Sequence, residues 1–298
     1  MRASTLLGTA LAIALLGFAT SASAFCRLTT CQPSDSCEKD EQGCPIEGKP
    51  ILWTKMPIPY RLHSRTAPGW DYKKLFASID AAFAHWESAT CDNGEKTSLR
   101  FERGADAQPN ETDFPFSISM VNVGWPFDDS ALAQTTHDFG KESGTIKNAV
   151  IQVNTASHEF VLATDASSTA LSSESGADME SVLVHEIGHY IGLAHSEVQG
   201  SIMAPTYCQD EARCARAKTS RDLGPDDVKA VCTLYPPSSR KPNLGADPDG
   251  GNATSFGCTQ SSSSGAPTVA PIGVLVALAL VTVRRRSARR AVERLDRL

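Results

Sequence analysis

The chain has 298 residues, of which 41% are hydrophobic, 21% charged and 7% aromatic, a globular profile that excludes a wholly disordered or fibrous protein. The formal net charge is −6, yet residues 25–257 alone hold 20 basic and 32 acidic residues. A segment this acidic lacks the basic face that nucleic acids require, so we expect no nucleic-acid partner.

The first 24 residues have the pattern of a secretory signal peptide. Arg2 precedes an apolar run from Leu6 to Phe18, and Ala22-Ser23-Ala24 matches a signal-peptidase site. We therefore expect export, with cleavage after Ala24. The alternative interpretation is a short helix of the protein core.

Residues 25–50 form a short, polar, Cys-rich segment. An even number of cysteines in an exported chain favours disulfides. Eight cysteines precede Cys258 and predict four disulfides: Cys26, Cys31, Cys37, Cys44, Cys91, Cys208, Cys214 and Cys232. Pairing within 26–44, and of Cys208 with Cys214, is plausible. A zinc knuckle in 26–44 is less favoured, because that segment has no Cys-x-x-Cys pair.

The next part of the chain predicts strands around one amphipathic helix. Pro57 and Pro59 exclude a helix from Trp53 to Leu62, which we expect to be extended. A helix follows, because a single 3.6-residue stripe is apolar: Leu75, Ile79, Ala82, Phe83 and Trp86. Further strands are expected at Leu99–Phe101, Ser117–Val121 and Ala149–Asn154, and 122–148 is expected to be loop.

Two more helices complete the predicted domain. Asp178 is a suitable N-cap for a helix that begins directly after it, and Pro225 can start a short helix that runs to Tyr235. Residues 236–268 are rich in Pro, Ser, Gly and Asn, a composition typical of a linker.

One motif carries the chemistry. His185-Glu186-Ile187-Gly188-His189 places two imidazoles at i and i+4 on one helix face, a spacing that suits one Zn²⁺ with Glu186 beside a water. Gly192 can turn the chain out of the helix through a positive φ, so that His195 returns as a third ligand. Three protein ligands leave a fourth position open, which is typical of a catalytic zinc site.

The continuation of this motif resembles the metzincin zinc metalloproteases, and specifically their matrixin branch. Met203 matches the Met-turn of that clan, and Pro205-Thr206-Tyr207 is similar to the wall of the matrixin prime-side pocket. Weaker matches extend the resemblance to about 51–236: Pro59-Tyr60-Arg61-Leu62, Ala82-Phe83-Ala84-His85-Trp86 and Leu223-Gly224-Pro225-Asp226-Asp227-Val228.

The resemblance implies an α+β fold: a twisted mixed β-sheet, a backing helix and a zinc-binding active-site helix. It also implies an edge strand that holds the substrate, with Ala131-Leu132-Ala133 as a loose match. Glu186 would be the catalytic base, and Pro205 and Tyr207 would line the substrate pocket.

The chain also departs from the matrixin pattern. The Pro-Arg-Cys-Gly latency motif is missing, and we interpret the cysteine of Gly43-Cys44-Pro45 as disulfide-bonded. His137 and His158 are interpreted as loop-surface histidines. Calcium is possible at four loop residues, although solvated side chains are the default interpretation: Asp128, Asp129, Asn154 and Asp165.

The C-terminal residues 258–298 predict a sorting or membrane tail. Residues 269–283 are apolar and 15 long, and Arg284-Arg285-Arg286 follows them. Cys258, the apolar run and the arginines together resemble a MYXO-CTERM-type sorting tail, which implies removal of the tail and delivery to the cell surface. The alternative is a simple membrane anchor.

We therefore expect an exported zinc endopeptidase acting on proteins or peptides, with a catalytic domain over 51–237, a linker over 238–257 and the tail over 258–298. Two alternatives remain: a non-proteolytic zinc-containing surface binding module, and a disulfide-rich structural protein. Glu186 separates the endopeptidase from the binding module, because a binding module needs no general base. Zinc content tests the structural-protein alternative.

Overall fold

The computed structural model describes residues 25–31, 36–63, 69–106, 115–162, 176–207, 221–238 and 251–260, the last as backbone only. The expected signal peptide, the residues Asp165, Cys208 and Cys214, and the tail beyond 260 lie outside these ranges. No helix among the described residues is both long and apolar enough to cross a membrane.

The predicted amphipathic helix is present as α1 (Tyr72–Glu87), and all five residues of its apolar stripe are buried. Asp71 caps its N-terminus by accepting a hydrogen bond from Lys74 N. Trp86 lies under the second long helix, α3 (Met179–Tyr190), and its indole donates to Val184 O at 2.8 Å. This contact fixes α1 behind α3.

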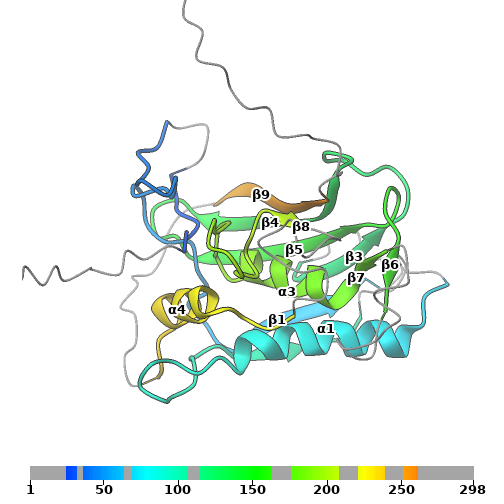
Figure 1. Ribbon diagram of the computed structural model, residues 1–298, viewed down its shortest axis with the longest axis horizontal. Helices are drawn as coiled ribbons and strands as arrows, with labels where there is room; N and C mark the ends of the chain where they lie inside the picture. The colour runs from blue at the N-terminus through cyan, green and yellow to red at the C-terminus, as the bar shows by residue number, and fades with distance from the viewer. Residues whose placement is uncertain are drawn as a thin grey trace, which may run out of the picture. The chain divides into compact units, whose positions relative to one another are not determined.

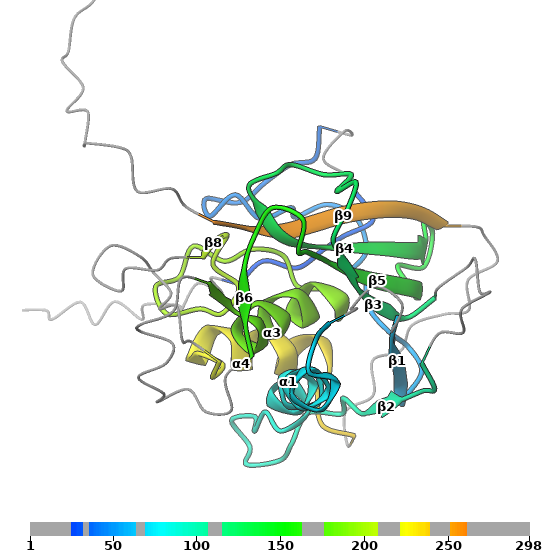
Figure 2. The ribbon, with the colours of Figure 1, turned by 90° about the vertical axis from the view of Figure 1, so that its right-hand side faces the viewer.

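The main sheet is mixed and seven-stranded, in the order β2-β1-β3-β5-β4-β9-β8; Figure 1 labels all of these strands but β2, which is labelled in Figure 2. The bounds are β1 Ile58–Leu62, β2 Phe101–Arg103, β3 Ser117–Val121, β4 Ala131–Gly140, β5 Ile146–Asn154, β8 Thr206–Tyr207 and β9 Gly251–Gln260. β1 pairs in parallel with β2 and with β3, and β3 pairs in parallel with β5. β4 is antiparallel to both β5 and β9. A separate pair joins β6 (Phe160–Val161) to β7 (Ala177–Asp178).

The helices α1 and α3 lie on one side of this sheet, and their apolar faces meet the strands in a single core (Figure 2). Fully buried aliphatic residues of β3 and β5, such as Ile118, Ile151 and Val153, form the sheet side of that core. The expected α+β architecture with a backing helix is therefore confirmed.

Two segments differ from the sequence-based expectation. Residues 131–140, within the segment expected to be loop, form the long strand β4. Residues 251–260, assigned to the linker and the start of the tail, form β9 against it. Nearly all side chains of β4 are buried, so its sequence lacks the alternation of a half-exposed strand. For this reason the sequence did not predict a strand here.

Three disulfides join described cysteines: Cys26–Cys44, Cys31–Cys37 and Cys91–Cys232. The first two confirm pairing within 26–44 and place Cys44 in a disulfide. The third joins the loop after α1 to the last helix, α4 (Pro225–Leu234), across 141 residues of sequence.

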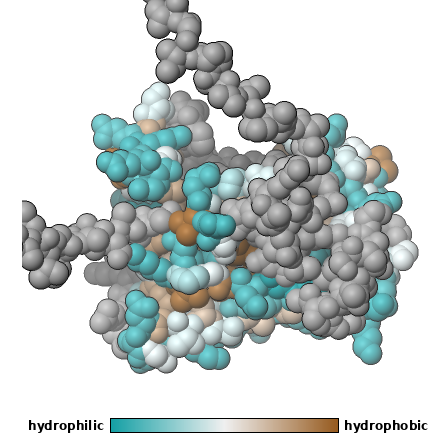
Figure 3. All heavy atoms as spheres, viewed as in Figure 1, coloured by the Kyte–Doolittle hydropathy of each residue, from teal (hydrophilic) through white to brown (hydrophobic). Residues whose placement is uncertain are grey.

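On the face drawn in Figure 3, the brown, hydrophobic areas of the described residues are small and separate. Three large hydrophobic residues of the described chain are exposed: Ile46, Tyr72 and Val123.

Candidate metal centre

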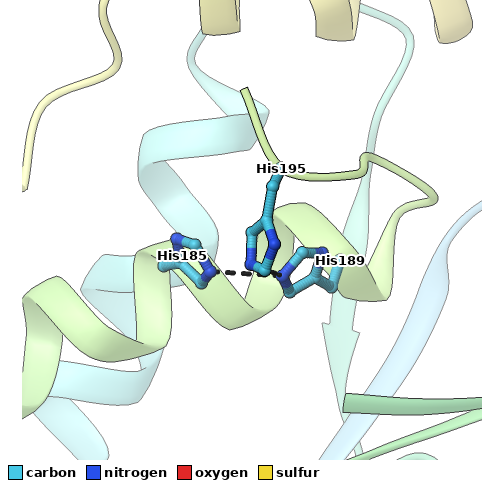
Figure 4. Close-up of side chains that lie close together, drawn as sticks. All are labelled: His185, His189 and His195. Carbon is cyan, nitrogen blue, oxygen red and sulfur yellow. Dashed lines mark hydrogen bonds between the residues drawn. The ribbon is translucent and has the colours of Figure 1, made fainter. Parts of the chain in front are cut away.

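The three predicted histidines converge. His185 and His189 project from one face of α3, and His195 approaches from the loop that follows the helix (Figure 4). His189 Nε2 lies 3.1 Å from His185 Nε2 and 3.2 Å from His195 Nε2. The donor atoms of all three residues lie within 4.8 Å of one another.

The other ring nitrogens orient two of these imidazoles. His185 Nδ1 lies 2.7 Å from Ile202 O, and His189 Nδ1 lies 2.8 Å from Leu193 O. A carbonyl can only accept, so each Nδ1 carries the proton and each Nε2 presents its lone pair toward the other rings. Burial, and then the neighbouring His195, hold the pKa of His189 well below its usual value.

This donor set fits zinc. Ligands 2.0–2.1 Å from a tetrahedral ion lie about 3.3 Å apart, close to the separations around His189. Neutral, oriented imidazoles are the form that binds metal. The three side chains that sequence spacing selected are therefore the ones that the fold brings together.

Gly192 makes the return of His195 possible. Its φ is +98°, and a Cβ at this position would overlap with the backbone carbonyl of Ile51. A glycine is required both by the left-handed conformation and by this close approach. The prediction that Gly192 turns the chain out of the helix is confirmed.

The N-terminal Cys-rich segment supports the same turn. Leu28 N donates to Gly192 O at 2.8 Å, and Ala194 N donates to Cys26 O at 3.0 Å. The segment also lines a cavity of about 490 Å³ that opens beside His195 and Glu197. The backbone that carries His195 is thus held by the Cys-rich segment 25–50, for which the sequence predicted disulfides but no contact with the metal centre.

Glu186 belongs to α3, is fully buried and contacts β4. Its Oε2 accepts a hydrogen bond of 2.6 Å from the hydroxyl of Thr135, which also lies 3.2 Å from Glu186 O. Thr135 belongs to β4 and was not identified from the sequence, because its strand was expected to be loop. The hydroxyl fixes one carboxylate oxygen of Glu186.

Met203 lies directly beneath the helix. It is 2% exposed, and a Cβ at Gly188 would overlap with its Sδ. The turn that carries it is held by Asp227, which accepts from Ser201 Oγ at 2.6 Å and from Ile202 N at 2.8 Å. Burial raises the pKa of Asp227, and these hydrogen bonds oppose the shift. Asp227 lies in a matched stretch of sequence, but its role was not predicted.

Tyr207 and Pro205 follow this turn. Tyr207 is fully buried, and its hydroxyl accepts from Asp178 N at 2.9 Å. Asp178 caps α3 as predicted, through Ser181 N, and also binds Arg221 through two hydrogen bonds of 2.8 and 2.9 Å. Arg221 is a supporting residue that sequence reasoning missed, because its partner lies 43 residues away.

His137, His158 and the described candidate calcium residues form hydrogen bonds within the protein. His137 is not on a loop surface as expected: it is buried in β4, its Nε2 lies 2.8 Å from His189 O, and burial lowers its pKa to about 4. His158 Nε2 lies 2.8 Å from Asp129 O. Asp128 accepts from Ser130 N and Oγ, and these hydrogen bonds lower its pKa. Asn154 donates to Ala131 O at 2.9 Å.

Comparison with known proteins agrees with this geometry. The family model described as Matrixin matches residues 52–236. This chain belongs to the matrixin family. The match begins at Leu52 and ends just after Tyr235, so it covers every strand of the main sheet except β9, both long helices and α4.

Named relatives of this matrixin occur in plants and animals. It is 32% identical over 154 residues to Metalloendoproteinase 2-MMP of Arabidopsis thaliana, covering 52% of this chain and 35% of that protein. It is 29% identical over 220 residues to Macrophage metalloelastase of Rattus norvegicus, covering 72% of this chain and 40% of that protein. The matrixin spans less than half the length of these relatives.

Proposed function

We propose that this matrixin is a zinc-dependent endopeptidase that hydrolyses peptide bonds in proteins. The observation that carries the proposal is the convergence of three imidazole Nε2 atoms beside a buried carboxylate, Glu186. Family membership and relatives named as metalloendoproteinases support it. One catalytic zinc would be held by His185, His189 and His195.

When bound, zinc supplies a Lewis acid that brings the pKa of a water molecule toward about 7 and polarises a carbonyl. The protein supplies the proton transfer. Glu186 would accept the proton of the attacking water and deliver it to the leaving amine. Thr135 would hold one oxygen of the Glu186 carboxylate in place during this transfer.

The substrate would lie extended along β4. An extended peptide can add to a sheet edge through main-chain hydrogen bonds, with side-chain pockets giving specificity. A backbone N–H near Ala133 would stabilise the developing oxyanion. Pro205 and Tyr207 would form the wall of the prime-side pocket, which favours substrates with a large apolar residue after the cleaved bond.

The deciding experiment is cleavage of such a peptide by the full chain, with and without a zinc chelator. Glu186→Gln keeps the shape of the side chain and removes the base, so it should retain zinc and reduce kcat by about 10²–10⁴. Glu102→Gln, at an exposed position on β2, is the matched control and should cleave like the parent. A Glu186→Gln variant that binds zinc and cleaves at the parent rate would refute this mechanism, and a parent that binds zinc without cleaving any peptide would favour the binding-module alternative.

We further propose that the protein is exported, that residues 1–24 are its signal peptide and that 258–298 is a MYXO-CTERM-type tail. The Cys-rich segment would remain attached to a catalytic domain over 51–237, with 238–257 as the link. Disulfides among the described cysteines support an oxidising compartment. The mass of the mature protein, measured from membrane and medium fractions, tests both cleavages and separates the sorting tail from a simple anchor. Calcium at the Asp128 loop stays a prediction, tested by titration of the metal.

A further inference from the structure

Strand β9 lies at the edge that the proposed substrate would use. It pairs antiparallel with β4 from Ala131↔Thr259 to Gly140↔Gly251. At its other edge it pairs parallel with β8, through Thr206↔Thr259 and Tyr207↔Gln260. Without β9, β4 would be the last strand of the sheet and β8 would have no partner in it.

The same strand runs beside the part of β4 that contacts Glu186. Thr135, which holds Glu186, is the register partner of Phe256, and Gln134 is the partner of Gly257. The backbone of β9 also contacts the helix α3 that carries two of the histidines. Figure 2 shows β9, in orange, running along the outer side of β4.

We propose that Gly251–Gln260 is an internal ligand of this edge: it occupies the peptide-binding side of β4 and competes with substrates for it. This inference rests on the proposed function, because it assigns an occupant to the same site. The outer edge of β4 would bind a peptide in an extended conformation. In this chain that peptide is the segment that follows the catalytic domain.

The composition of β9 suits a displaceable occupant. The segment contains two glycines and an asparagine, no charged residue and no β-branched aliphatic residue. Gly and Asn are depleted in strands, whereas Thr254, Phe256 and Thr259 are of types enriched there, so the segment relies on main-chain pairing with its neighbours more than on apolar packing. The buried strands β3 and β5, by contrast, carry Ile, Met and Val in the core.

The connection to the domain keeps the segment within reach. Sixteen residues separate the end of α4 at Leu234 from Gly251, and these span at most about 50–60 Å when extended. A tether of this length gives an effective local concentration on the order of millimolar. A free peptide must compete with that concentration. Cleavage of the proposed tail at Cys258 would also remove Thr259 and Gln260, which pair with β8.

The first test uses proline in the full chain. Two adjacent prolines, Ser255→Pro with Phe256→Pro, remove at least one ladder N–H and should release β9 from β4. The matched control, Ser263→Pro with Ser264→Pro, lies outside the strand. We expect an apparent KM at least about tenfold lower in the first variant, with unchanged kcat, and parent values in the control. A synthetic Gly251–Gln260 peptide should restore the higher KM.

A second test requires neither proline nor turnover. In the full-length Glu186→Gln protein, we would measure amide hydrogen exchange of β4 and β9 while adding a peptide with a large apolar residue. If β9 is displaced, its amides exchange faster while those of Ala131–Gly140 stay protected. If bound peptide leaves β9 exchange unchanged, or the proline variant unfolds or loses zinc, β9 is a permanent strand and the inference is wrong. A protein that cleaves nothing would contradict the proposed function, and exchange would still decide whether the edge is occupied.

Discussion

Thr135 Oγ1 donates a hydrogen bond of 2.6 Å to Glu186 Oε2, and this single contact couples the sheet to the chemistry of α3. The two residues are 51 positions apart and both are buried. The carboxylate that the proposed reaction needs is therefore positioned by β4, the strand whose outer edge pairs with β9.

Removing this hydroxyl should impair turnover without removing the metal. Thr135→Val keeps the shape of the side chain and leaves one oxygen of Glu186 without its donor. A hydrogen bond to a charged group contributes about 1.5–3 kcal/mol, so kcat should fall by about 10- to 100-fold at unchanged KM. Thr135→Ser restores the donor and should restore most of kcat. Equal losses in both variants would show that packing, and not the hydroxyl, is what matters.

Zinc content should depend on His195. His195→Ala removes the one donor supplied from outside the helix, and purified protein should then lose most of its zinc, measured as the metal-to-protein ratio. His158→Ala is the control, because that ring contacts Asp129 O away from the cluster. Stoichiometric zinc in the His195→Ala protein would exclude this residue as a ligand.

The turn at Gly192 should tolerate no side chain. Gly192→Ala combines a left-handed φ of +98° with overlap on the Ile51 carbonyl, and we expect a loss of about 2–4 kcal/mol in the free energy of unfolding. Gly200→Ala is the comparison: its φ is +84°, but nothing lies within 4 Å of the added Cβ. It should cost about 1–2 kcal/mol, from the backbone conformation alone. Equal losses in denaturant unfolding would mean that the contact with Ile51 contributes nothing.

The long-range disulfide should stabilise the fold more than the short one. Cys91–Cys232 closes a separation of 141 residues and Cys31–Cys37 one of 6. Loop-closure entropy predicts that the free energy of unfolding falls by about 4–5 kcal/mol when Cys91 and Cys232 are both changed to Ser. It predicts a fall of about 2 kcal/mol when Cys31 and Cys37 are changed in the same way. Thermal unfolding under non-reducing conditions measures both. The reverse order would show that local packing, and not loop closure, governs the effect.

The sequence predicted what periodicity and local spacing encode. The apolar stripe of α1, the Asp178 cap of α3, the strand β3 and the His185-to-His195 spacing are all local patterns, and the fold has each of them. That these histidines bind zinc stays a prediction, which the His195→Ala experiment addresses.

What the sequence did not predict depends on contacts between distant segments. Strand β4 is buried on both faces yet includes Gln134, Thr135 and His137, so it has neither the alternation of an exposed strand nor the apolar run of a buried one. Thr135 and His137 form hydrogen bonds with α3, which lies some 50 positions further along the chain. Strand β9 has a linker composition and is ordered by its partner. Eight cysteines allow 105 pairings, so Cys91–Cys232 could not be selected.

Tyr235, near the end of the domain, forms hydrogen bonds with three segments that precede it in the chain. Its hydroxyl accepts from Trp53 N at 2.9 Å and donates to Ile191 O at 2.7 Å, and its carbonyl accepts from Thr97 Oγ1 at 2.7 Å. Synthesis proceeds from the N-terminus, so the segments that contain Trp53, Thr97 and Ile191 all emerge before the residue that joins them. We therefore expect a nascent chain that ends before Tyr235 to lack the hydrogen bond from this hydroxyl to Ile191 O, at the end of α3. The proposed peptidase activity would then arise only once the chain has been made as far as Tyr235, so a partly synthesised chain would not be exposed to its own active site.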